Sequence, residues 1–74
     1  MNILVKVRNE ILDKGLRPYT SLGQLPEHLL KDTFVAFQPE EIDLEEMNMI
    51  IVSQIGEIFL VYSTDFEFLQ KDGR

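Results

Sequence analysis

The 74-residue sequence contains no cysteine, no tryptophan and only one histidine. The lack of cysteine excludes disulfides and thiolate metal sites, and one histidine is too few for a closed zinc site of nitrogen and sulfur ligands. A domain of this length buries only about 60% of the surface that its unfolded chain exposes. We therefore expect a single domain, residues 1–74, without cofactor or metal. Its missing stability comes from unusually good packing or, as we prefer, from a second chain.

Basic residues are missing from more than half of the sequence. Residues 32–69 contain nine carboxylates and no lysine or arginine. Residues 1–31 contain five bases and three acids, the last five residues contain two bases and one acid, and the net charge is −6. A protein of this sign repels phosphate groups, so we predict no direct binding to DNA or RNA.

A membrane-spanning apolar run is also missing. Residues 47–62 are apolar at 11 of 16 positions, but polar residues interrupt them well short of the roughly 18 apolar residues that a spanning helix needs. The opening MNILVKVRNE has charges where the apolar centre of a signal peptide should continue. We expect no membrane contact and a cytoplasmic location.

The first segment, residues 2–14, favours a helix. Its apolar residues, among them Leu4 and Ile11, share one helical face, and Gly15 is a typical helix stop. The alternative is a strand over Ile3, Val5 and Val7, which alternate with Lys6 and Arg8. After a loop over residues 16–24, LPEHLLKDTF predicts a second helix that begins at Pro26. A third, acidic helix is predicted over residues 39–47.

From Met49 onward the composition is typical of strands. MIIVSQ and EIFLVYS are rich in branched and aromatic residues and flank Gly56, which predicts a tight antiparallel hairpin. A third strand is predicted over residues 66–69. We thus expect an α+β fold, with two or three short helices packed on a small antiparallel sheet. A single helix over residues 40–54 is the alternative for the central segment.

Both faces of the predicted hairpin are apolar, and this is unusual for a small sheet with one wet face. Two short helices can cover only one face. Leaving the other face wet forfeits about 1.5–3 kcal/mol for each large side chain. We therefore predict self-association, most simply as a dimer, unless all three helices wrap the sheet. The side chains assigned to this contact are Met49, Ile51, Phe59 and Val61.

The densest charge in the sequence is an acidic run after Pro39. It consists of Glu40, Glu41, Asp43, Glu45 and Glu46. Such a run is often only a solvated surface. A calcium loop is a weaker alternative, because the glycine that calcium loops use for their sharp turn is missing between residues 32 and 54. The third interpretation is a surface for a basic partner protein, whose approach the negative field would accelerate.

No catalytic or phosphate-binding motif is present, and His28 has no nucleophile or orienting acid nearby in a known arrangement. We therefore predict a non-enzymatic protein-binding module. Its most concrete form is an inhibitor, immunity or antitoxin-like factor of the kind that phages and mobile elements encode. Its partner would be a basic surface, such as that of a nucleic-acid-binding protein or a toxin. The alternative is a structural or assembly subunit in which the apolar sheet face matters and the acids only solubilise.

Overall fold

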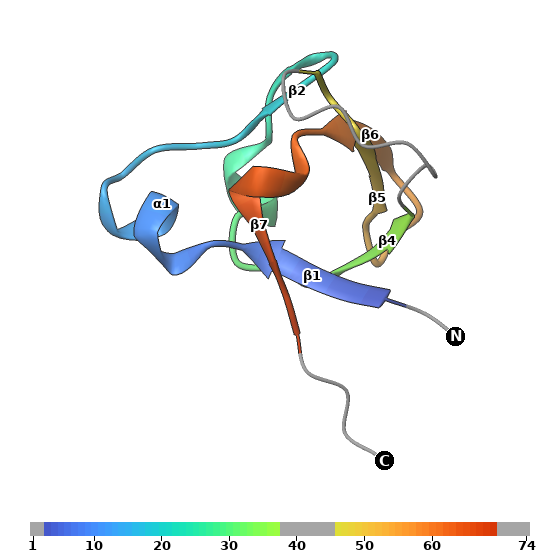
Figure 1. Cartoon of the computed structure of the whole chain (residues 1–74), viewed down its shortest axis with the longest axis horizontal. Coiled ribbons are helices and arrows are strands. Elements are labelled where there is room, and N and C mark those ends of the chain that lie inside the picture. Colours follow the sequence, from blue (N-terminus) through green and yellow to red (C-terminus); the bar gives the residue numbers. More distant parts are fainter. Residues whose placement is uncertain (1–2, 38–45, 70–74) are drawn as a thin grey trace.

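The computed structural model describes residues 3–37 and 46–69 and consists mainly of short strands (Figure 1). The elements, with η denoting a single turn of 3-10 helix, are β1 (Ile3–Val7), α1 (Asn9–Asp13), β2 (Tyr19–Thr20), β3 (Gly23–Gln24), η1 (Glu27–Leu29), β4 (Phe34–Phe37), β5 (Met49–Val52), β6 (Ile58–Val61), η2 (Ser63–Asp65) and β7 (Phe66–Phe68).

All seven strands of the described residues belong to one antiparallel sheet with the order β3-β2-β6-β5-β4-β1-β7. Strands β4, β5 and β6 are consecutive neighbours, and β1 lies between β4 and β7. The strands β2, β6, β5, β4 and β1 follow one another round an arc in Figure 1, so the sheet has a concave and a convex side. This curvature lets a short chain enclose a core with very little helix.

The core lies on the concave side. Ten apolar residues of the described chain are buried: Val5, Val7, Leu25, Leu29, Phe34, Ala36, Met49, Ile51, Val61 and Phe66. The rings of Phe34 and Phe66 meet edge to face, with centroids 6.1 Å apart, which is a favourable aromatic geometry. This contact joins β4 to β7 across the intervening β1.

The predicted α+β fold with two or three helices on a small sheet is wrong. Residues 3–7, predicted as part of a helix, form β1, and the alternative strand reading is confirmed there. Val5 and Val7 are fully buried because β1 lies between two strands and its period-two pattern turns them inward. The stop signal at Gly15 is real, with φ 71°. It ends only the five-residue α1, because the residues before Asn9 are in β1.

The predicted second helix is also wrong over most of its length. A single 3-10 turn, η1, follows Pro26, and the chain then enters β4. In β4, Phe34 and Ala36 are buried while Phe37 is exposed, so the segment alternates as a strand does. The helical spacing of the leucines in the sequence was outweighed by the pairing of β4 with both β1 and β5.

The C-terminal hairpin is confirmed, as is a third strand, which is β7. Gly56 in the β5–β6 turn has φ 88°, in the region that glycine adopts most easily. The alternative helix over residues 40–54 is wrong at Met49–Val52, which form β5. Most of the predicted acidic helix, residues 39–47, lies outside the described residues. No helix in the described ranges is long and apolar enough to span a membrane.

Candidate protein-binding surface

The structure describes only one member of the predicted acidic site. Glu40, Glu41, Asp43 and Glu45 lie outside the described residues. Glu46 is described and exposed, three positions before β5 begins. The acidic run is therefore known here mainly from the sequence, and its role stays a prediction.

The four residues predicted for self-association point to the concave side. Met49, Ile51 and Val61 are completely buried, and Phe59 is half-buried against the core. These side chains are therefore already packed in the chain's own core. Self-association itself stays a prediction, but the side chains available for it lie on the opposite side of the same strands.

The convex side of β1, β4, β5 and β6 carries a continuous set of apolar side chains, which we call the outer apolar face. It consists of Leu4, Val35, Phe37, Ile50, Val52, Ile58 and Leu60. Their neighbours in sequence point inward, and side chains alternate along a strand. Phe37 is 55% exposed and Ile58 is 65% exposed, whereas the two valines are half-buried by their neighbours.

The pairing register arranges this face in two rows that cross the strands. In the first row, Phe37, Ile50 and Leu60 are direct partners across β4, β5 and β6. The second row runs across four strands and contains Leu4, Val35, Val52 and Ile58. Cross-strand partners of this kind are in side-chain contact. The face is therefore one patch and not a set of scattered apolar residues.

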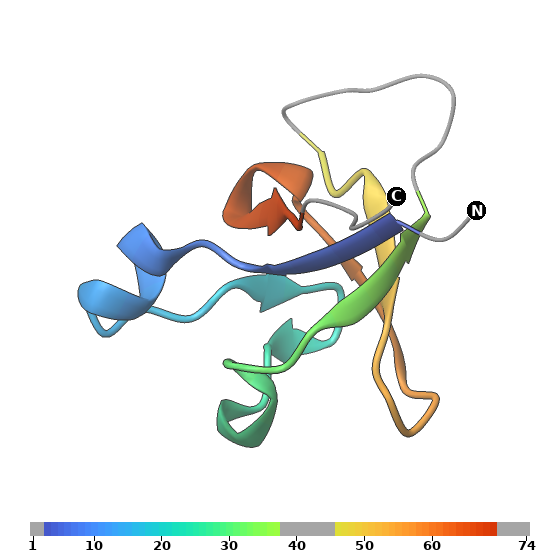
Figure 2. The same cartoon turned by 90° about the horizontal axis from the view of Figure 1, so that it is seen from below.

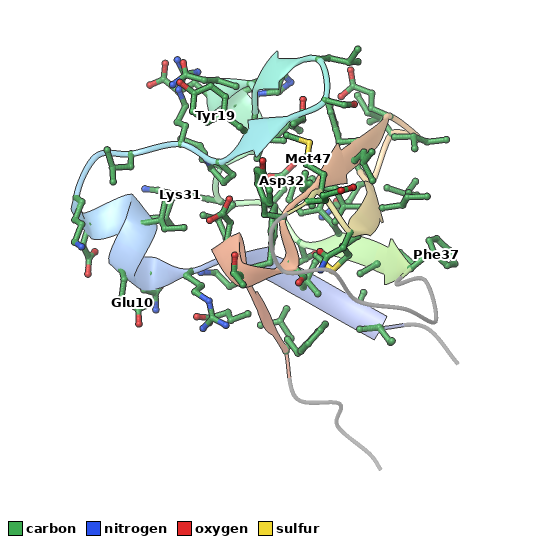
Figure 3. All side chains as sticks on the ribbon, turned by 45° about the horizontal axis from the view of Figure 1, so that its top comes forward. Glu10, Tyr19, Lys31, Asp32, Phe37 and Met47 are labelled. Atoms are coloured by element: carbon green, nitrogen blue, oxygen red, sulfur yellow. The ribbon has the colours of Figure 1, made fainter. Side chains whose placement is uncertain are left out.

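No described helical element covers the outer apolar face. In Figure 2, α1 and the turns η1 and η2 all lie to one side of strands β4, β5 and β6, which is the concave side. Figure 3 shows the Phe37 side chain projecting away from the body of the molecule. Within the described chain, the convex side of these strands is therefore exposed to solvent.

Polar groups appear only where this face ends. Beyond the second row, the Gln54 side-chain amide donates to the Thr33 hydroxyl at 3.3 Å. On β1, Lys6 is the next residue after Leu4 on the same side of the strand, and it is paired in register with Glu67 of β7. The Lys6 ammonium donates to the Val7 carbonyl at 2.8 Å and to the Asn9 side chain at 2.9 Å. None of the seven side chains of the face is ionisable.

Hydrogen bonds at both ends of the β5–β6 hairpin hold the rows in register. At the turn, the Ser53 amide donates to the Glu57 carbonyl at 2.8 Å, and the Ser53 hydroxyl accepts from the Glu57 amide at 3.0 Å. At the open end, the Asn48 amide donates to the Val61 carbonyl at 2.9 Å, and the Asn48 side chain accepts from the Ser63 amide at 3.0 Å. Both Ser53 and Asn48 are buried.

The described charged side chains around the hairpin are acidic, and no lysine or arginine lies within the hairpin itself. Glu46 and Glu57 are exposed, and no ion pair within the described residues involves either of them. Asp65, in η2, is half-buried, and burial raises the pKa of its carboxyl while the nearby Arg8 partly opposes this. The Arg8 guanidinium donates instead to the Thr64 carbonyl at 2.8 Å.

A separate shallow hollow of about 280 Å³ lies between α1 and η1, and Leu12, Gly15, Leu16, Arg17, Glu27 and Leu30 line it. The Arg17 guanidinium is already engaged by the Leu25 carbonyl at 3.3 Å and the Gln24 side chain at 3.1 Å. His28 is exposed and lines no part of the hollow. Across residues 3–37 and 46–69, no three His, Cys, Asp or Glu side chains are grouped to hold a metal.

Comparison with known proteins gives no further guide, because no protein family, curated protein or solved structure matches this chain.

The four side chains that the sequence analysis assigned to self-association lie on the concave side of the hairpin, and the exposed apolar side chains lie on the convex side. The signal that distinguishes the two sides lies in the neighbouring strand β4, where Phe34 and Ala36 are buried and Phe37 is exposed. Because the LPEHLLKDTF segment, which ends at Phe34, was predicted to be helical, the alternation over residues 34–37 could not be matched to the hairpin. A strand assignment for residues 34–37 would have added Phe34 and Ala36 to one face of the hairpin and Phe37 to the other. The face that the rest of the chain encloses is the core.

Proposed function

We propose that this chain is a small protein-binding module whose acidic second half binds a basic surface on another protein. The observation that carries the proposal is the charge distribution: nine carboxylates and no base between residues 32 and 69. A field of one sign accelerates association with a surface of the opposite sign, and the acceleration falls as salt rises.

The described residues support this proposal in two ways. The exposed carboxylates Glu46 and Glu57 form no ion pair with a base in the described chain, so they are free to interact with another molecule. The basic residues of the first half are also partly engaged elsewhere: Lys6, Arg8 and Arg17 donate to carbonyl or amide oxygens.

A partner that matches this chemistry presents lysines and arginines, as the nucleic-acid-binding site of a protein or the active surface of a basic toxin does. In that arrangement the carboxylates stand where phosphates otherwise bind. An inhibitor, immunity or antitoxin-like role follows from this chemistry and from the small size of the chain.

The test is capture of partners from the native cells at low and high salt, followed by binding measurements with the purified partner. Replacing Glu41, Asp43 and Glu45 with lysine should abolish capture. The matched control replaces Glu10, Asp13 and Glu27 with lysine, which changes the net charge equally but in the first half of the chain. All three control residues are exposed. Equal loss with both variants, or no salt dependence, would refute a specific acidic surface.

A structural or assembly subunit is the second candidate, and the uncovered outer apolar face favours it. Under this alternative the acids serve only solubility. The lysine triple variant would then retain its partner, whereas substitutions on the outer apolar face would release it.

A further inference from the structure

We propose that the outer apolar face is where a second copy of this chain docks, forming a weak, reversible two-fold dimer by packing sheet against sheet. This inference does not depend on the acidic surface proposed above.

The outer apolar face leaves a large apolar area uncovered. The exposed parts of the seven side chains amount to roughly 400–500 Å², comparable to the largest apolar patch on a typical monomer, which is often functional. Two such faces together remove on the order of 1,000 Å² from water, near the lower limit for a specific interface. A dimer of this size is expected to be reversible, with a Kd on the order of micromolar.

The outer apolar face also fits a copy of itself. It contains no ionisable group, so packing two faces together buries no charge. Its centre is formed by Ile50 and Val52 of β5, with β4 and β6 on either side. Branched side chains in rows of this kind interdigitate when two sheets stack about 10 Å apart. A two-fold axis through β5 gives each row an apolar counterpart.

The net charge of the chain predicts how the dimer should respond to salt. Each chain carries −6, so two copies repel each other at long range, and this repulsion is screened over about 10 Å at 0.1 M salt. Raising the salt should therefore tighten the dimer. A basic partner on the same face would show the opposite dependence. Salt thus separates self-association from the acid–base binding proposed above.

The experiment is analytical ultracentrifugation of the full chain from about 1 to 500 μM at 50 and 500 mM salt, a range that brackets a micromolar Kd. We expect a monomer–dimer equilibrium that is severalfold tighter at the higher salt. Phe37→Ser and Ile58→Ser should each weaken it by at least tenfold. Leu16→Ser is the matched control, because Leu16 and Phe37 are both 55% exposed but Leu16 lies at the hollow beside α1. Circular dichroism checks that each variant keeps its fold.

The absence of cysteine allows the contact to be located directly. A nitroxide attached to the variant Gln54→Cys, an exposed position at the edge of the outer apolar face, should broaden the amide signals of β4, β5 and β6 in added ¹⁵N-labelled chain that carries no nitroxide. The same label on Leu16→Cys should not. A chain that stays monomeric at 500 μM and high salt overturns the proposal, as do broadened signals confined to other surfaces. A monomer whose outer apolar face becomes protected only when a basic protein is added also overturns it, and assigns the face to that partner.

Discussion

The two sides of β5 have nearly the same composition and opposite environments. Met49 and Ile51 point to the concave side and are completely buried, whereas Ile50, between them in sequence, is 41% exposed. The same contrast holds in β6, where Val61 is buried and Leu60 is 38% exposed. Hydrophobicity alone therefore does not decide which side of this hairpin becomes the core.

The curvature of the sheet decides it. The concave side packs against Leu29 of η1 and Phe66 of β7, which belong to the same buried cluster. The convex side faces no described element (Figure 2). The described residues fill the concave side of the sheet and leave none of their own to cover the convex side. The difference between the two sides is thus a difference in what the rest of the chain can reach.

The largest effect on stability is expected when a side chain on the concave side is shortened. Ile51→Ala should lower the free energy of unfolding by about 2–5 kcal/mol, because it removes buried methyl groups and leaves a cavity. Since the core of so small a domain supplies only roughly 3–5 kcal/mol, the variant should be largely unfolded at room temperature. Urea unfolding followed by circular dichroism measures this. A loss below about 1 kcal/mol would mean that the concave side is not the close-packed core.

A second test addresses the turn that sets which residues face inward. Gly56 has φ 88°, and a side chain added there would meet no atom within 4 Å. Gly56→Ala should therefore cost about 1–2 kcal/mol through backbone strain alone. Gly56→Asn is the control and should cost less, because asparagine tolerates this conformation better. Equal losses, measured by urea unfolding, would show that φ at this position is not the cause.

The turn matters to the comparison because a shift of one residue in pairing exchanges the two faces of a strand. The register Val52↔Ile58 and Ile50↔Leu60 is the one that this turn permits. The hairpin could be predicted from sequence because its signals are local: branched residues on both sides of a glycine.

The rest of the fold could not be predicted in the same way, because its signals are not local. Residues 34–37 form a strand only because β1 and β5 are present on both sides, and β1 in turn is completed by β7 from the far end of the sequence. Considered alone, these segments have helix-compatible spacing. Both the surplus of apolar surface on the hairpin and the acidic charge of the second half were visible in the sequence, but the exposed side of the sheet was not.

A smaller effect is expected from pH, through Asp65 beside the core. Burial raises the pKa of Asp65 above its ordinary value of 3.8, with Arg8 partly opposing the shift. The folded state thus holds this proton more tightly than the unfolded state does. The contribution of Asp65 to stability is present below pH 3.8 and is lost as the pH rises through the raised pKa.

Asp65→Asn should therefore be more stable than the natural chain at pH 7, and the advantage should fade at pH 3. Thermal unfolding over this pH range measures the difference. Glu57→Gln is the control, because it removes one carboxylate that is exposed and lies away from the core. A natural chain that is more stable than Asp65→Asn at neutral pH would contradict a penalty from burial.

The smallest effect on the free energy of unfolding is expected for a substitution on the convex side of β5, next to Ile51 in the sequence. Ile50→Thr keeps the branched side chain that suits a strand and should change the free energy of unfolding by no more than about 1 kcal/mol in dilute solution, the scale of cross-strand side-chain contacts. Concentration then becomes the informative variable. If the outer apolar face binds a second copy, the unfolding midpoint of the natural chain should rise with protein concentration, because association stabilises only the folded state. The midpoint of Ile50→Thr should rise much less. A large loss at micromolar concentration would instead show that Ile50 belongs to the monomer core, and the two sides of β5 would no longer be distinct.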